Sequence, residues 1–238
     1  MNSVLLIGFL VGMGHALEAD HLAAVGSMAS GRTSPKRLAI MGAAWGLGHT
    51  ITLFLLCSAV ILLGFVLTDR LAATLEFGVG IMLIILGADV LRRMVKKKVH
   101  FHVHHHGDGQ RHVHAHSHEG APVPHEADAH EHRHARLFAL RPLLVGLAHG
   151  AAGSAGLLAL AVAASKSPMT SLLYVLVFGV GSMCGMATLT LSAAWPLRWI
   201  ERGGIILYRG LYLCIGALAI GLGCHILLSN GPSVFGAA

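Results

Sequence analysis

The segment GHALEADHLAAV, residues 14–25, carries two histidines and two carboxylates within seven positions of an otherwise apolar stretch. The run MNSVLLIGFLVGMG leads into it, and no lysine or arginine occurs before Arg32. An apolar segment of this length can cross a bilayer. Ionisable side chains inside such a segment are costly to insert, so they indicate a functional site.

The composition extends this conclusion to the whole chain. Its 238 residues are 55% hydrophobic and only 12% charged, whereas soluble domains carry about 25% charged residues. We therefore predict an all-α polytopic membrane protein. The first span lacks a basic n-region and carries acids, so it is not a cleavable signal peptide. The expected helices cover roughly 3–29, 38–67, 71–95, 138–164, 169–197 and 205–229.

Lysine and arginine predict the orientation of these helices. Placing the loop after the first helix inside leaves only Arg70 and Lys166 on the outer side. This positive-inside bias predicts a multi-pass protein of the cell inner membrane with both termini periplasmic. Membrane orientation thus explains the net charge of +6, and we expect no nucleic-acid partner. The lipid bilayer is the expected surrounding.

Two three-helix units are expected, at 1–95 and 137–238, separated by a polar loop at 96–136. Because three spans are an odd number, a duplicated unit must be inserted upside down, as in many secondary transporters. Matches between the units occur in order at nearly one offset. They are Gly12-x-x-His15 with Gly146-x-x-His149, Gly46-x-Gly48-His49 with Gly179-x-Gly181-Ser182, and Gly80 and Gly87 with Gly216 and Gly223.

Five polar residues on three helices are expected at a common depth of roughly 12–21 Å in a hydrocarbon layer of about 30 Å. Imidazole nitrogen and carboxylate oxygen without thiolate suit nickel, cobalt or zinc. Asp20 would neutralise the charge of the ion and exchange a proton. The predicted metal ligands are His15, Asp20, His21 and His49, with His149 as a fifth contributor or gate.

The first helix poses a geometric problem. At 100° per residue, a straight helix cannot direct His15, Asp20 and His21 at one ion. Gly12 and Gly14 would permit an unwound segment just before the cluster, as in discontinuous transporter helices. If the helix is straight, Glu18 replaces Asp20 as the inward carboxylate.

Other polar residues are weaker candidates. Ser182, aligned with His49, could supply a hydroxyl or support a ligand, while Cys184 has the default interpretation of a small buried hydrophobe. Asp89 lies near the inner end of its helix, where snorkelling to the interface would explain it. Glu76 and His225 lie nearer the outer face, where they form either a gate or ordinary hydrogen bonds.

The polar loop contains thirteen histidines and almost no apolar residues, so we expect it to be disordered without metal. Neutral imidazoles bind divalent ions, and capture, buffering, delivery and sensing are all open roles. A cytoplasmic nickel chaperone is a candidate partner on this side. The expected auxiliary ligands are His102, His104, His105, His106, His112, His114, His116 and His118.

The motif HALEADHLAAV resembles the HAxDADHI motif of the nickel/cobalt transporter family, matching at His15, Asp20 and His21. WGLGHTITL is similar to the second motif of that family, and GVGSMCGMATLT looks like a later one. GLAHGAAGSAGLLAL, which contains His149, resembles the six-helix branch linked to urease accessory permeases. This resemblance implies secondary transport of Ni²⁺ or Co²⁺ as substrate, with no resident cofactor.

Departures from the family pattern bear on direction. The acidic motif of the larger members is missing, and related efflux proteins typically read HALEPGH, without the aspartate found here as Asp20. We therefore favour uptake over efflux. A b-haem electron-transfer subunit is the alternative from another class. Neither HExxH nor GxxxxGK[ST] occurs, so we expect neither a zincin-type hydrolase nor an ATPase, and no enzyme.

Overall fold

The computed structural model describes residues 2–29, 34–96, 100–105, 111–116, 135–152, 167–193, 195–196 and 205–236. The helices are α1 (Asn2–His15), α2 (Ala19–Met28), α3 (Pro35–Leu63), α4 (Asp69–Lys96), α5 (Ala135–His149), α7 (Pro168–Ser192) and α9 (Ile205–Phe235). Local signals set some of these bounds. At the start of α3, the Ser34 hydroxyl accepts from the Arg37 N–H and Pro35 occupies the first turn, whereas Gly64 ends the helix with a φ of 67°.

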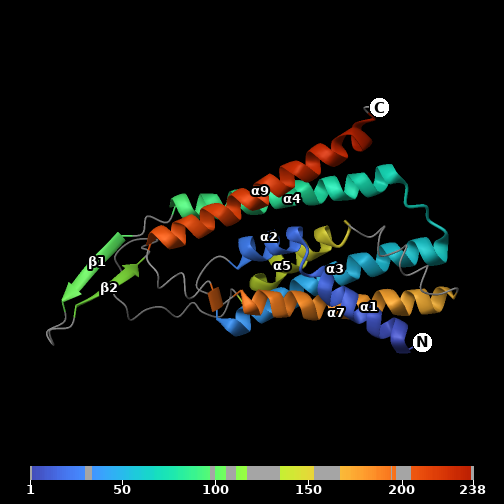
Figure 1. Ribbon diagram of the computed structural model, residues 1–238, viewed down its shortest axis with the longest axis horizontal. Helices are drawn as coiled ribbons and strands as arrows, with labels where there is room; N and C mark the ends of the chain where they lie inside the picture. Colours follow the sequence, from blue (N-terminus) through green and yellow to red (C-terminus); the bar gives the residue numbers. More distant parts are fainter. Residues whose placement is uncertain are drawn as a thin grey trace.

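The helices form two groups, which are joined through α2 and through a contact between α4 and α5. Helix α4 packs along α9, and a second group contains α3 against α7 and α5, and α1 against α7. Helix α2 contacts both α4 and α9 (Figure 1). The start of α1 and the end of α9 lie at one end of the molecule, and the β1–β2 hairpin lies at the other (Figure 1). The tight packing of α1, α3, α5 and α7 brings the polar residues of the first unit to those of the second.

Four described helices are long and apolar enough to cross a membrane, and the α1–α2 pair makes a fifth if it is counted as one span. Large apolar side chains cover their outer faces, among them Leu63 at 81% exposure and Leu228 at 78%. Such an outer surface is unfavourable in water and suits contact with lipid. The architecture is that of a multi-pass membrane protein.

Glycines allow the helix backbones to touch. A Cβ added to Gly12 would lie 2.1 Å from the Phe178 carbonyl oxygen, and one on Gly146 would lie 2.0 Å from that of Trp45. Small residues at helix interfaces are typical of membrane proteins, because they let the backbones approach closely. Tight contacts of the same kind also occur at Gly8, Gly42, Gly46, Gly181 and Gly185.

Two predicted spans are interrupted. The expected continuous helix 3–29 is divided into α1 and α2, whose axes differ by 56°. The expected helix 138–164 leaves the helical path at His149, with turns over 150–152, and residues 153–166 lie outside the described part. Gly150 packs so closely on the His49 backbone that an added Cβ would lie 2.3 Å from its carbonyl oxygen. This contact fixes the point at which the chain turns.

Part of the histidine-rich loop has regular structure, where we expected none. Strands β1 (His100–His105) and β2 (Arg111–His116) pair antiparallel. The register pairs His100 with His116, His102 with His114 and His104 with His112. Alternating histidines favour this arrangement because a strand places every second residue on the same face. His106 and His118 lie outside the described residues.

Candidate metal centre

A break in the first span positions its polar residues. Helix α1 ends at His15 and α2 begins at Ala19, with the Leu17 N–H donating to the Gly14 carbonyl at 2.9 Å and the Glu18 N–H to that of His15 at 3.1 Å. The expected break in the first helix is therefore confirmed, but it lies after Gly12 and Gly14, which both belong to α1. Gly12 serves close packing, and neither it nor Gly14 has a positive φ.

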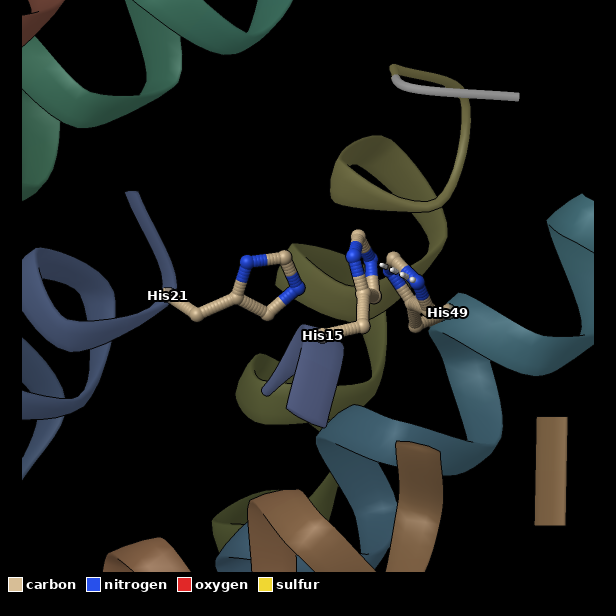
Figure 2. A group of neighbouring side chains, drawn as sticks. All are labelled: His15, His21 and His49. Atoms are coloured by element: carbon tan, nitrogen blue, oxygen red, sulfur yellow. Dashed lines mark hydrogen bonds between the residues drawn. The ribbon is translucent and has the colours of Figure 1, made fainter. Parts of the chain in front are cut away.

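Three imidazoles from α1, α2 and α3 converge at this break. The Nε2 atoms of His15 and His49 lie 3.3 Å apart. The ring of His21 lies 4.6 Å from that of His15 and 5.3 Å from that of His49, measured between centroids. Figure 2 shows the His21 ring directed toward the other two. One donor atom from each of the three residues lies within 4.8 Å of the other two.

Asp20 joins this cluster to the second half of the chain. Its Oδ1 accepts from the Nδ1–H of His21 at 2.9 Å, and its Oδ2 accepts from the Nε2–H of His149 at 2.8 Å. The nitrogen is the donor in each case because an ionised carboxylate only accepts. Asp20, His21 and His149 form a second group of donor atoms within 4.8 Å of one another. Asp20 is thus the inward carboxylate, as the broken-helix prediction requires.

Three histidines of the cluster are buried and carry polar atoms without a partner among the described residues. His21, His49 and His149 are exposed by 0%, 0% and 1%. No hydrogen-bond partner among the described residues reaches Nε2 of His21, Nδ1 of His49 or Nδ1 of His149. Buried polar atoms normally have partners, and those without one need an explanation such as an ion.

Glu18 lies at the edge of the cluster. Its carboxylate accepts from the Nδ1–H of His15 at 2.7 Å, and its side chain is 57% exposed. A carboxylate that holds one ring nitrogen of a histidine leaves the other nitrogen free as a ligand. Glu18 thus supports His15 and does not replace Asp20.

The remaining candidates lie apart from the two groups of donor atoms. Asp89 on α4 accepts from Arg93 at 2.6 Å and from Arg141 of α5 at 2.5 Å, so an ion pair accounts for it. Cys184 is exposed, contrary to its default interpretation as a buried side chain. Ser182 is buried on α7, and its hydroxyl has no partner among the described residues.

Two aromatic side chains were missed by the sequence reasoning. The Trp45 ring lies 5.4 Å from that of His21 and 5.8 Å from that of His149, and the Phe178 ring lies 5.5 Å from that of His15. Trp45 precedes His49 by four residues, which places both on one face of α3. That spacing was the available signal. The aromatic rings shield the histidines from water, and polar interactions are stronger in the resulting environment of low dielectric.

Comparisons with known proteins add one relative. The chain is 28% identical over 229 residues to the urease accessory protein UreH of Bacillus sp. (strain TB-90), covering 96% of this chain and 92% of the relative. No family model matches the chain. No solved structure matches it either. The accessory role given in the name of the relative supports the expectation that the chain is not an enzyme.

Proposed function

We propose that this chain is a secondary transporter that carries Ni²⁺ or Co²⁺ into the cell across the bacterial inner membrane. The observation that carries the proposal is the set of four histidines and one aspartate at a break in a membrane span, three of which are fully buried. Borderline divalent ions prefer this nitrogen-rich, thiolate-free donor set. Similarity to a urease accessory protein supports nickel as a substrate, since the motifs resemble the transporter branch linked to such proteins.

The proposed ligands are His15, Asp20, His21 and His49, with His149 as a fifth contributor or gate. Their donor atoms already lie in two tight groups, and the spacing of 3.3 Å between His15 and His49 supports them. Two imidazoles on one tetrahedral ion, with bonds of about 2.0–2.1 Å, would have nitrogens about 3.3 Å apart. Asp20 supplies the negative charge that partly neutralises the ion.

We further propose six spans arranged as two inverted repeats. Equivalent glycines make equivalent contacts, which supports this architecture. Gly12 lies against Phe178 and Ser182, as Gly146 lies against Trp45 and His49, and the partners correspond at an offset of 133. The same exchange relates the contact of Gly80 with Gly223 to that of Gly87 with Gly216. Helices α1 and α5 also both end at the corresponding histidine.

The histidine-rich loop is proposed to face the cytoplasm, where it binds divalent ions beside the membrane centre. The positive-inside distribution of lysine and arginine supports this orientation. The loop would hold ions near the inner mouth and transfer them to a cytoplasmic nickel chaperone. Both chain termini would then be periplasmic.

A b-haem centre is less well supported. The rings of His49 and His149 lie 5.9 Å apart, and the ring of His21 contacts both, at 5.3 Å and 4.2 Å. A porphyrin plane between His49 and His149 would have to displace His21. The purified protein should therefore show no strong visible haem band, and such a band would overturn the metal-transport proposal.

Uptake of radioactive nickel into intact cells tests the transport proposal. Wild type should accumulate nickel above the empty vector, whereas Asp20→Ala and His49→Ala should not. His225→Ala is the matched control, because His225 is an exposed histidine on α9. Deletion of residues 100–134 should preserve uptake. Accumulation below the empty vector, reversed by the same variants, would identify an exporter, and no difference in any variant would refute nickel transport.

A further inference from the structure

The five side chains, of which His21, His49 and His149 are buried and His15 and Asp20 are partly exposed, form two overlapping groups. His15, His21 and His49 make one, and Asp20, His21 and His149 make the other. His21 belongs to both. Because an imidazole nitrogen lies about 2.0–2.1 Å from a bound ion, two ligands of one ion lie at most about 4.2 Å apart. Each group approaches this limit with its donor atoms within 4.8 Å of one another, but the five residues do not form one such group.

The first group is arranged to receive an ion. The Nδ1–H of His15 donates to Glu18 at 2.7 Å and that of His21 donates to Asp20 at 2.9 Å. With the proton on Nδ1, the Nε2 atom of each neutral ring carries a lone pair. The Nε2 atom of His21 is buried and has no hydrogen-bond partner among the described residues. The Nε2 atom of His15 accepts from the Nε2–H of His49 at 3.3 Å, so one proton must leave this group when an ion enters. Carboxylates that hold one nitrogen and free the other are typical of metal-binding histidines.

The second group is closed in this conformation. The two oxygens of Asp20 accept from His21 and His149, so the Nδ1 atom of His21 and the Nε2 atom of His149 hold protons there. An ion can enter only when those two protons leave and the Asp20 contacts are exchanged for coordination. Asp20 therefore acts as a positioning residue for the first group and as a ligand in the second.

We propose that the transported ion occupies two coordination positions in turn, a tri-histidine position at His15, His21 and His49 and an aspartate-containing position at Asp20, His21 and His149. This inference rests on the proposed function. His21 presents Nε2 to the first position and Nδ1 to the second, so the ion passes from one side of its ring to the other. The first position draws on α1, α2 and α3, and the second adds α5 from the other half of the chain.

A single five-ligand centre and two successive positions predict different effects of equivalent substitutions. His49 and His149 are both buried, and both would lose an imidazole on mutation to alanine. In a single centre, either change removes one ligand from the bound ion. With two positions, only His49→Ala changes the resting coordination, while His149→Ala impairs the onward step.

X-ray absorption of the full-length purified protein tests this difference after loading with one equivalent of Co²⁺. In every variant the loop histidines of residues 100–134 are replaced by asparagine, so that only the membrane centre binds the ion. We expect three imidazoles in wild type, three in His149→Ala and two in His49→Ala. Equilibrium dialysis with radioactive nickel should show a dissociation constant for His149→Ala within a factor of about three of wild type, and for His49→Ala at least tenfold weaker. Cellular uptake should nevertheless be lost in both variants.

His149→Gln is measured beside His149→Ala. Its amide keeps a hydrogen-bond donor near Asp20, so this variant should fold even if the cavity left by alanine prevents folding. If His149→Gln and His149→Ala lose an imidazole from the bound ion as His49→Ala does, the two-position proposal is overturned and a single centre is correct. If wild type binds neither nickel nor cobalt, the proposed function itself fails. Retained uptake in both His149 variants would also overturn the onward step.

Discussion

At the scale of single residues, Asp20 contributes most to the arrangement of the centre. One carboxylate accepts from His21 on its own helix and from His149 on α5, at 2.9 and 2.8 Å. Its neighbour Glu18, two positions earlier, reaches only His15 and lies largely exposed. Because the helix is broken before Ala19, Asp20 contacts the histidines of the cluster from two helices, whereas Glu18 contacts His15 at its edge. Substitutions at these two positions should therefore have different consequences.

Asp20→Asn should weaken nickel binding by about 10–100-fold, the usual effect of losing a group that orients metal-binding histidines. The amide oxygen can accept from only one of the two imidazoles, and its nitrogen would oppose the other N–H. Equilibrium dialysis with radioactive nickel on purified protein measures the change. Glu76→Gln is the control, since Glu76 is a half-buried acid of α4 outside the two groups of donor atoms. Equal affinities of Asp20→Asn and wild type would contradict the role given to Asp20.

At the scale of helices and strands, close backbone contact determines where the donors lie. Helix α1 meets α7 through Gly12, whereas Gly14, two residues later, has no atom within 4 Å of where its Cβ would be. Thr50 adds a polar contact between α3 and α7, donating to the Gly179 carbonyl at 3.0 Å. The helix positions are therefore sensitive to volume at particular glycines and insensitive at others.

Gly12→Ala should destabilise the folded protein by about 1–3 kcal/mol, because its methyl group would overlap the Phe178 carbonyl and force the helices apart. Gly14→Ala makes the same chemical change in the same helix and should be neutral or slightly stabilising, since alanine is the better helix former. Thermal unfolding in detergent, followed by loss of the monodisperse peak, compares the two variants. Similar transition temperatures for both would show that α1 does not depend on this contact.

The hairpin gives a second comparison at this scale. The register pairs His104 with His112, so His104 has a histidine as its cross-strand partner, whereas the adjacent His105 pairs with Arg111. Cross-strand neighbours have Cβ atoms about 4.5–5.5 Å apart, which suits two imidazoles on one ion. His104→Ala should lower the number of nickel ions that the full-length protein binds at saturation, and His105→Ala should not. An equal loss in both variants would mean that the strand pairing does not select the loop ligands.

At the scale of the whole molecule, both ends of the described chain lie at one end of the long axis and the histidine-rich hairpin lies at the other (Figure 1). This placement agrees with an even number of spans, because only an even number returns the chain to its starting side. The proposed orientation in the membrane rests on the positive-inside distribution of lysine and arginine along the sequence.

A C-terminal alkaline phosphatase fusion should be active in cells and a C-terminal green fluorescent protein should be dark, because phosphatase matures in the periplasm and the fluorophore in the cytoplasm. Insertion of the same reporters between β1 and β2 should give the reverse result and serves as the internal control. An active phosphatase in the loop would invert the orientation and with it the assignment of the cytoplasmic face.

Much of this protein was predictable from its sequence because the relevant signals are local. Long apolar runs fix the class and most span boundaries, and the polar residues of the centre are few enough to recognise singly. The repeat offset likewise pointed to His15 and His149 as equivalents. The broken first span was foreseen from the angular positions of three residues, but its location after His15 was not.

The tertiary structure decided the rest, because it depends on contacts between distant segments. The packing of α1 on α7 and of α5 on α3 determines three features. They are the 56° bend between α1 and α2, the end of α5 at His149, and the contact of Asp20, in place of Glu18, with His149. The roles of Trp45 and Phe178 beside the histidines have the same origin. The sequence determined which side chains are available in the membrane, and packing determined which of them meet. A helix carries side chains on all its faces, and only the neighbouring helices determine which face makes contacts.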